Sequence, residues 1–308
     1  MNIIIFIISL CLMIYGANLL VNGSVLIANR FKIPEFIIGA LIVGIGTSLP
    51  ELVVSLTATI NGMNDVAVGN VIGSNIFNIL GILGLTALLY PININKESTK
   101  FDIPIFGIIT ILIYGLSFSR NNVFGISRFD GIILLSFFAF YVLNSLKLNE
   151  KQINKEAIIE NISLTKSIIS IIGGLILLII NCDLFIDSSV NIARYLNVSE
   201  SFISLTIISC GTSMPELVSS VTAAFKKKSD IAIGNIVGSN IFNIAFILGT
   251  CSLVEPLTNS NITQIDYLVM IFATLLVIIC GLFGKINRKM GAFMILSFIA
   301  YVIYLYLI

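Results

Sequence analysis

Ten apolar stretches, each followed by a polar segment, make up most of this sequence of 308 residues. A helix needs about 20 mostly apolar residues to cross a bilayer. Charged residues are only 11% of the chain, whereas about a quarter is usual in soluble domains. We therefore predict an all-α integral membrane protein with ten transmembrane helices, at about 2–28, 35–60, 66–90, 103–119, 131–147, 167–193, 201–225, 231–253, 267–284 and 290–307.

The 17 Lys and Arg residues lie between the predicted spans or, for Lys147, at the end of one, and their distribution predicts an orientation. Ten spans place both termini on one side of the membrane. Loops on that side hold Arg120, Arg128 and Arg194, and the opposite loops hold the other fourteen. Because cytoplasmic loops carry the excess of Lys and Arg, we expect a multi-pass protein of the cell membrane with both termini outside and a cytoplasmic linker at 147–166.

The chain contains an internal repeat. GTSLPELVVSLTA at 46–58 corresponds to GTSMPELVSSVTA at 211–223, and GNVIGSNIFN at 69–78 corresponds to GNIVGSNIFN at 234–243. Over 44–78 against 209–243, 20 of 35 aligned positions are identical, at a constant offset of 165 residues. We predict a first five-helix repeat at 1–147, a linker at 148–166 and a second repeat at 167–308. Five spans are an odd number, so the second repeat is inverted, as in many secondary transporters.

Two glutamates, Glu51 and Glu216, lie at the centres of the second and seventh predicted spans. A carboxylate at this depth is costly and marks a functional site by default. Since no Lys or Arg lies within a predicted span, a bound cation is the simplest partner. Asp183 and Asp187 lie in the outer half of the sixth span, where a water-filled vestibule and a role in ion entry both remain open.

Polar residues around both glutamates recur at helical spacing. Hydroxyl groups lie four residues before and after each glutamate, at Thr47, Ser55, Thr212 and Ser220. Pro50 and Pro215 lack an N–H, which we expect to free backbone carbonyls around Gly44–Gly46 and Ser209–Gly211. Carboxylate, hydroxyl and carbonyl oxygens are the ligands that Ca²⁺ prefers, and Na⁺ is also a hard cation.

The third and eighth spans carry a second duplicated set, consisting of Asn70, Ser74, Asn78, Asn235, Ser239 and Asn243. Glycine pairs four residues apart, Gly69 with Gly73 and Gly234 with Gly238, permit close helix approach. That approach brings Asn78 and Asn243 towards the glutamates. A proline kink or a GxxxG pair alone is typical of packing, but duplication of the whole set favours function.

At GTSLPE, GTSMPE and the two GSNIFN segments the sequence resembles the calcium/cation antiporter superfamily, specifically its sodium/calcium exchanger branch of prokaryotic type. The resemblance covers the whole chain and implies ten spans with two repeats. It implies that the transported ions, Na⁺ and Ca²⁺, share ligands on Glu51, Glu216, Thr47, Ser48, Thr212, Ser213, Ser74, Asn78, Ser239 and Asn243, with backbone carbonyls from Gly44 and Ser209. It also implies that the first and sixth spans slide to alternate access.

One position departs from the family pattern. Many relatives carry Asp where this chain has Asn243, and the potassium-dependent exchangers use that Asp for K⁺. We therefore expect K⁺-independent exchange. Two glutamates are neutralised by one Ca²⁺, whereas three Na⁺ leave one positive charge, so the three-for-one exchange that the family implies is electrogenic.

Three other functions compete with sodium/calcium exchange. A Ca²⁺/H⁺ antiporter is the nearest alternative, and the proton-coupled branch usually has an asparagine-containing motif at the GTSxPE position. A cation channel usually closes its filter from several identical subunits, which fits two inverted repeats less well. An enzyme needs a nucleophile with a base, and the chain has no histidine. We expect no enzyme activity and no cofactor. Besides the transported ions, the lipid bilayer is the only partner that we expect, with no nucleic acid and no protein partner.

Overall fold

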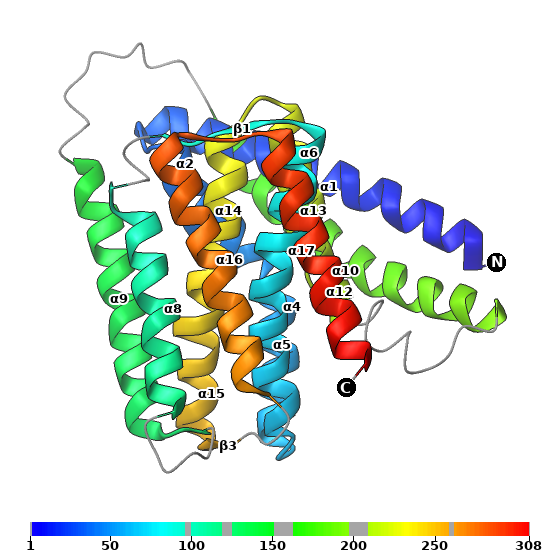
Figure 1. The fold of residues 1–308 in the computed structure, drawn as a ribbon. Helices are drawn as coiled ribbons and strands as arrows, with labels where there is room; N and C mark the ends of the chain where they lie inside the picture. Colours follow the sequence, from blue (N-terminus) through cyan, green and yellow to red (C-terminus); the bar gives the residue numbers. More distant parts are fainter. Residues whose placement is uncertain are drawn as a thin grey trace.

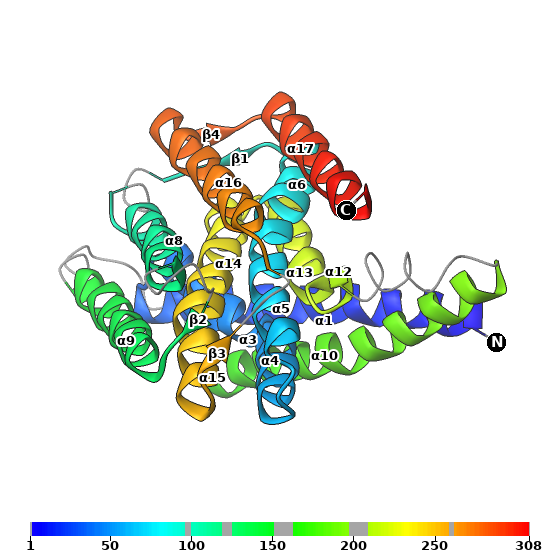
Figure 2. The same cartoon turned by 60° about the horizontal axis from the view of Figure 1, so that its bottom comes forward.

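The structure is a computed structural model that describes residues 2–95, 100–118, 125–150, 163–196, 209–258 and 262–307. It is built almost wholly of helices (Figure 1). Two long helices, α1 (Asn2–Phe31) and α10 (Leu164–Tyr195), lean away from a bundle formed by the other helices. Figure 2 shows that these two helices lie side by side.

Each half of the chain contributes a similar series of elements. The first half continues with α2 (Glu35–Ile38), η1 (Gly39–Gly44), α3 (Ile45–Thr47), α4 (Leu49–Ile60), α5 (Asn64–Ile76), η2 (Phe77–Leu83), α6 (Gly84–Leu89), α8 (Asp102–Phe118) and α9 (Arg128–Glu150). The second half continues with α12 (Ser209–Gly211), α13 (Met214–Phe225), α14 (Ser229–Ile241), η4 (Phe242–Ile247), α15 (Leu248–Val254), α16 (Gln264–Phe283) and α17 (Arg288–Leu307). The three η segments are π-helical.

The all-helical membrane class is confirmed, and the count of ten spans stays a prediction. Seven helices of the described chain are long and apolar enough to cross a membrane, or eight if the bent pair Glu35–Thr47 and Leu49–Ile60 is one span. Helix α8 is apolar but has only 17 residues. The predicted seventh span begins at 201, and 197–208 lie outside the described residues. Most of the predicted linker, 151–162, does so too.

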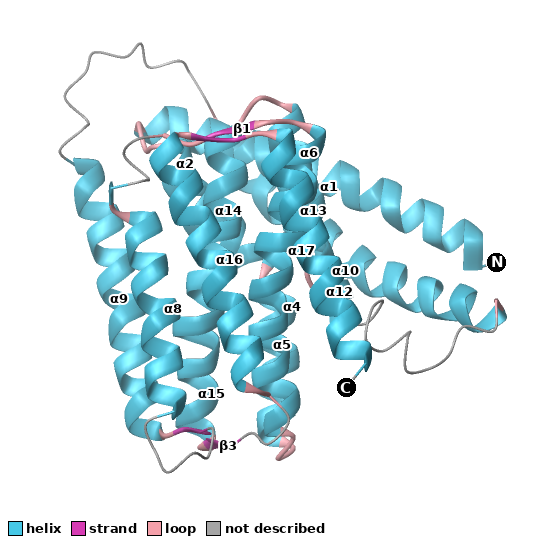
Figure 3. Ribbon diagram, in the orientation of Figure 1, coloured by secondary structure: helices cyan, strands magenta, loops and turns pink. Residues whose placement is uncertain are grey.

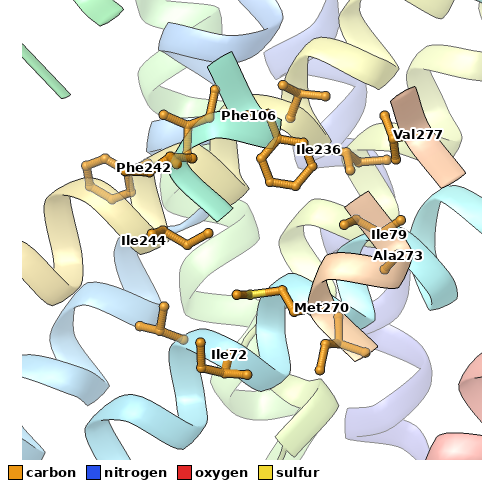
Figure 4. Packing of buried hydrophobic residues seen from close by; sticks show 14 of the residues in the cluster. Ile72, Ile79, Phe106, Ile236, Phe242, Ile244, Met270, Ala273 and Val277 are labelled. Atoms are coloured by element: carbon orange, nitrogen blue, oxygen red, sulfur yellow. The ribbon is translucent and has the colours of Figure 1, made fainter. Parts of the chain in front are cut away.

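The core lies where the helices that carry the two GSNIFN segments pass through the bundle, namely α5 with η2 and α14 with η4. Ile72 and Ile79 from the first half pack near Ile236 and Ile244 from the second, and all four are fully buried (Figure 4). By contrast, the outer helices α1, α9 and α17 expose many large apolar side chains. A lipid-facing exterior explains this pattern, since every apolar side chain is equally well solvated by lipid tails.

Four two-residue strands, which the sequence did not predict, join the two halves of the chain. Strand β1 (Ile92–Asn93) pairs antiparallel with β4 (Lys285–Ile286), and β2 (Gly125–Ile126) pairs with β3 (Leu257–Thr258). They lie at opposite ends of the bundle (Figure 3). Strands this short carry no periodicity in the sequence, and they form because extended loops from the two halves lie side by side.

Helix α16 shows how side chains define an element and tie it to its neighbour. Thr263 donates from its backbone N–H and its hydroxyl to Asp266 Oδ2, at 2.7 and 2.8 Å, and forms a capping box. The helix ends at Gly284, whose φ of 71° is left-handed. Tyr301 of α17 donates to the other oxygen of Asp266 at 2.6 Å, so one carboxylate both caps α16 and holds α17.

Glycines allow α1 and α10 to cross closely. A Cβ added at Gly174 would lie 2.6 Å from the Gly16 carbonyl oxygen and 2.7 Å from the Leu20 nitrogen. A Cβ added at Gly16 would lie 2.9 Å from the Gly174 carbonyl oxygen. Such small residues let two membrane helices bring their backbones together. Any larger side chain at this crossing must push the helices apart.

Candidate metal-ion site

The helices that carry GTSLPE and GTSMPE are both interrupted just before the glutamate of the motif. Ser48, between α3 and α4, has φ and ψ of −86° and 10°, and Ser213, just before α13, has −87° and 10°. Pro50 and Pro215 lie in the first turn that follows each break. Proline has no N–H to donate to the preceding turn, so it is tolerated where a helix begins but not where one continues. The predicted interruptions are confirmed.

Glu51 and Glu216 are completely buried and are held by serines from the opposite half of the chain. Ser213 donates to Glu51 Oε1 at 2.8 Å, and Ser48 donates to Glu216 Oε1 at 2.8 Å. These reciprocal bonds bring the two interruptions together. The second oxygen of each carboxylate, Oε2, is buried and has no hydrogen-bond partner within the described residues.

Asn70 and Asn235 support the helices that begin with these glutamates. Asn70 donates to the Glu51 carbonyl oxygen at 3.2 Å and to Ser55 Oγ at 2.9 Å. Asn235 donates to the Glu216 carbonyl oxygen at 3.3 Å. It also donates to Ser220 Oγ at 2.7 Å. Ser55 and Ser220, four residues beyond each glutamate, therefore accept hydrogen bonds from Asn70 and Asn235 and support the fold.

Asn78 and Asn243 lie at equivalent points of the π-helical segments η2 and η4. Segment η2, which holds Asn78, contacts α13, and η4, which holds Asn243, contacts α4. Each asparagine is fully buried, on a segment that contacts the helix carrying the glutamate of the other half. Both Oδ1 atoms are buried without a hydrogen-bond partner among the described residues. Short π-helical segments inside α-helices occur frequently at functional sites.

Two further asparagines, which the sequence analysis did not single out, contact this pair. Asn78 Nδ2 donates to Asn240 Oδ1 at 3.0 Å, and Asn243 Nδ2 is 3.5 Å from Asn75 Oδ1. Asn75 and Asn240 are fully buried. They are the first asparagines of the two GSNIFN segments, so their duplication was the available signal. The spacing of four residues used to select candidates passed over them.

The expected free carbonyl at Gly44 is not present in this structure. The Gly44 carbonyl oxygen accepts from Ser48 N at 3.1 Å and from Ser239 Oγ at 3.0 Å. The correction has a simple reason, because Pro50 removes the donor for the carbonyl four residues earlier, at Gly46, and leaves the bond to Gly44 intact. On the other side, Ser209 begins α12, and the Gly211 carbonyl accepts from Cys182 Sγ at 3.2 Å.

The glycine pairs behave differently in the two halves. Gly234 and Gly238 of α14 face the backbone of α2 and η1, where an added Cβ would strike Phe36 and Ala40. For Gly73 of α5, no atom of the described residues lies within 4 Å of an added Cβ, and Gly69 meets only Ile262. Close approach is therefore confirmed for the second pair and is not seen for the first.

The remaining predicted hydroxyl ligands have mixed surroundings. Thr47 Oγ1 lies 3.2 Å from Asn235 Oδ1, and Ser74 Oγ donates to the Asn70 carbonyl at 2.6 Å. Thr212 Oγ1 is buried and is without a partner in the described chain. Asp183 and Asp187 are exposed on α10, and the choice between a vestibule and ion entry stays open.

The buried centre can bind a hard cation. It presents oxygens that lack a hydrogen-bond partner among the described residues, namely Glu51 Oε2, Glu216 Oε2, Thr212 Oγ1, Asn78 Oδ1 and Asn243 Oδ1. No Lys or Arg lies within 33–95, 195–225 or 229–284 to neutralise the two carboxylates. Carboxylate, amide and hydroxyl oxygens together suit Ca²⁺ and similar ions rather than soft transition metals.

Comparison with known proteins agrees with this chemistry. The family model described as sodium/calcium exchanger protein matches residues 1–147 and 166–307. The putative antiporter CaxA of Alkalimonas amylolytica is 34% identical over 96% of this chain and 95% of its own. The sodium/calcium exchanger MaX1 of Methanosarcina acetivorans is 30% identical over 100% and 99%.

Solved structures of the sodium-calcium exchanger NCX_Mj share the fold. The form soaked with zero Na⁺ and Ca²⁺ superposes with a TM-score of 0.85 at 32% identity and covers 99% of this chain and 98% of that one. A form soaked with 2.5 mM Na⁺ and 1 mM Sr²⁺ gives 0.84 at 33% identity, covering 98% and 97%. This chain is therefore a multi-pass membrane protein that belongs to the sodium/calcium exchanger family.

Proposed function

We propose that this protein exchanges Na⁺ for Ca²⁺ across the cell membrane by alternating access. The observation that carries the proposal is the pair of buried carboxylates, Glu51 and Glu216, each bonded to a serine of the other repeat and each with one oxygen left over. Two buried like charges without a basic partner repel each other. A divalent cation between them removes that repulsion and uses the free oxygens.

The proposed ligands surround these carboxylates. Glu51 and Glu216 supply the charge, and neutral oxygens come from Thr47, Ser48, Thr212, Ser213, Ser74, Asn78, Ser239, Asn243 and the carbonyls of Gly44 and Ser209. Ca²⁺ takes six to eight oxygens in flexible geometry, so not all of these bind one ion at once. Ser239 Oγ donates its proton to the Gly44 carbonyl, which leaves its own lone pairs for an ion. The Gly44 carbonyl accepts from both Ser48 N and Ser239 Oγ, so it must release one of these bonds to bind an ion.

Antiport follows if Na⁺ and Ca²⁺ compete for the same oxygens. One Ca²⁺ balances the two glutamates, whereas three Na⁺ exceed them by one charge, so exchange in that ratio moves net charge. Asn243 adds an amide rather than a third carboxylate, and we infer that the site does not require K⁺. The same two carboxylates can in principle carry protons, which keeps Ca²⁺/H⁺ exchange as the alternative outcome.

The inverted two-repeat architecture is part of the proposal, with ten spans in all. In its support, the interruptions at Ser48 and Ser213 have nearly equal backbone angles. The ladders β1·β4 and β2·β3 also swap partners between the halves and lie at opposite ends of the bundle. A site between two such repeats can open to either side of the membrane. The glycine crossing holds α1 and α10 together, and in the proposal these two helices form the pair that slides to alternate access.

Transport assays test the coupling. Proteoliposomes loaded with Na⁺ should take up ⁴⁵Ca²⁺ when diluted into Na⁺-free buffer, and a matched set loaded with K⁺ should not. An imposed inside-positive potential should change the rate if exchange is electrogenic. Uptake that follows a pH gradient and ignores Na⁺ would overturn the sodium-coupled proposal in favour of proton exchange.

Orientation is tested separately. The Lys and Arg distribution places Asn154 in the cytoplasm and the C-terminus outside. A single cysteine at Asn154, in a background without the five native cysteines, should be protected from an impermeant thiol reagent in intact cells. A cysteine added at the C-terminus should be labelled. The reverse pattern contradicts the proposed topology.

A further inference from the structure

We propose that Asn75 and Asn240 are positioning residues that turn the amides of Asn243 and Asn78 so that their oxygens face the ion. The inference rests on the proposed ion site and adds two residues to it. Each positioning residue acts through a hydrogen bond between the repeats, which we call a brace. Asn240 accepts from Asn78, and Asn75 accepts from Asn243.

The need for a brace follows from the chemistry of an amide. The carbonyl and amino ends of asparagine have almost the same shape, but only the carbonyl oxygen can bind a cation. A buried asparagine beside an ion therefore requires a partner that takes its amino end. Asn240 Oδ1 takes the amino end of Asn78 at 3.0 Å and leaves Asn78 Oδ1 without a partner among the described residues.

The change from α-helix to π-helix falls between the two asparagines of each span. Asn75 is the penultimate residue of α5 and Asn78 lies in η2, and Asn240 and Asn243 straddle the equivalent transition from α14 to η4. This transition therefore separates the asparagine that accepts from the other repeat from the asparagine whose amide oxygen has no partner among the described residues. The arrangement is the same in both halves.

Packing alone does not account for Asn75 and Asn240. Both are fully buried, and the Nδ2 of each lacks a hydrogen-bond partner within the described part of the chain. A buried donor without a partner is unfavourable, and an apolar side chain avoids that cost. Groups that orient the ligands of a metal, without touching it, fit this description.

An asparagine side chain can both donate and accept a hydrogen bond, and this property gives a specific test. Asn75 can accept from Asn243, or it can rotate and donate to a carboxylate at that position. The N75D/N243D variant leaves two acceptors facing each other, so the brace cannot form. The N240D/N243D variant has the same charge and the same aspartate at 243, but both of its braces can form, because Asn78 still donates to residue 240.

Ca²⁺ affinity should therefore differ between the two double variants. We expect the KM for Ca²⁺ of N75D/N243D to be about 10- to 100-fold above that of N240D/N243D, the usual effect of removing a group that orients a metal ligand. The rate at saturating Ca²⁺ should change less than the KM. Asn240→Leu should raise the KM by a similar factor. Asn144→Leu, at a partly exposed site on α9, is the control and should not raise it.

A binding measurement separates this inference from the coupling proposal. The Ca²⁺-induced rise in melting temperature of the purified variants reports ion binding whether Na⁺ or H⁺ drives transport. A wild-type protein that shows this rise but no Na⁺-driven uptake overturns the coupling proposal only. Equal Ca²⁺ affinity of the two folded double variants, or Asn240→Leu with unchanged affinity, overturns the positioning role.

Discussion

Replacing Glu51 by glutamine separates ion binding from folding, because the two processes should respond in opposite directions. Glutamine keeps an oxygen that can accept from Ser213 Oγ, the donor that lies 2.8 Å from Glu51 Oε1. What the substitution removes is one of two negative charges in a fully buried site. In the ion-free protein this charge repels that of Glu216, so its removal relieves an unfavourable interaction.

The magnitude of the binding loss follows from similar buried charge pairs. Removing one partner of a buried, hydrogen-bonded charge pair costs about 2–5 kcal/mol. At about 1.4 kcal/mol per factor of ten, this predicts Ca²⁺ affinity about 30- to 4,000-fold weaker. Glu216→Gln should behave in the same way, because Ser48 holds Glu216 as Ser213 holds Glu51. We expect Ca²⁺ transport to be abolished in both variants.

Two measurements on the purified protein test this reasoning. Without Ca²⁺, the melting temperature of Glu51→Gln should equal or exceed that of the wild type. A ligand present at 100 times its Kd stabilises the folded state by about 2.7 kcal/mol, so the same Ca²⁺ concentration should raise the wild-type melting temperature clearly and that of the variant little. ⁴⁵Ca²⁺ uptake in proteoliposomes gives the functional reading.

A conservative control makes the result interpretable. Glu35→Gln is the same chemical change at the partly exposed ion pair with Lys228, whose atoms are 2.6 Å apart. It should retain uptake and the Ca²⁺-dependent melting shift. Near wild-type transport by Glu51→Gln, or a lower ion-free melting temperature together with a preserved Ca²⁺ shift, would show that the glutamate serves the fold and not the ion.

Three further variants test other parts of the structure. Asn243→Asp adds a third carboxylate, and crowded like charges retain a proton more readily, so Ca²⁺ uptake should fall more steeply than in the wild type as the pH is lowered and should become sensitive to K⁺; an unchanged pH profile places Asn243 outside the ion shell. Gly174→Leu should stop uptake but spare the Ca²⁺-dependent melting shift, because the side chain collides with Gly16 and Leu20 of α1, whereas Gly173→Leu, with no described atom within 4 Å of an added Cβ, should transport. Tyr301→Phe removes the 2.6 Å bond to Asp266 and should lower the free energy of unfolding by about 1–3 kcal/mol, seen as a lower melting temperature with unchanged Ca²⁺ affinity.

Several features were predictable because they depend on local pattern. The apolar stretches indicate membrane helices, since a spanning segment must satisfy its own backbone and contact lipid over its length. Pro50 and Pro215 indicate the helix interruptions, because a missing N–H acts within one turn. Glu51 and Glu216 could be recognised as site residues from the cost of a charge at mid-membrane and from their duplication.

The number of spans shows where local pattern stops being sufficient. Helix α8 has 17 residues, fewer than the usual length of a spanning segment. The chain also changes direction by 46° between Glu35–Thr47 and Leu49–Ile60. Whether such segments cross the membrane depends on their neighbours and on tilt. The small ladders β1·β4 and β2·β3 likewise exist only because distant loops meet.

Tertiary structure decided which side chains of the candidate site contact one another. Ser48 binds Glu216 and Ser213 binds Glu51, each across more than 160 residues of sequence. The hydrogen bonds of Asn75 and Asn240, and the one from Ser239 to the Gly44 carbonyl, depend on the same cross-repeat packing. The residues of the site were thus largely evident from sequence, but their partners were not, because hydrogen-bond pairing between helices depends on how the two repeats pack and not on spacing along either one.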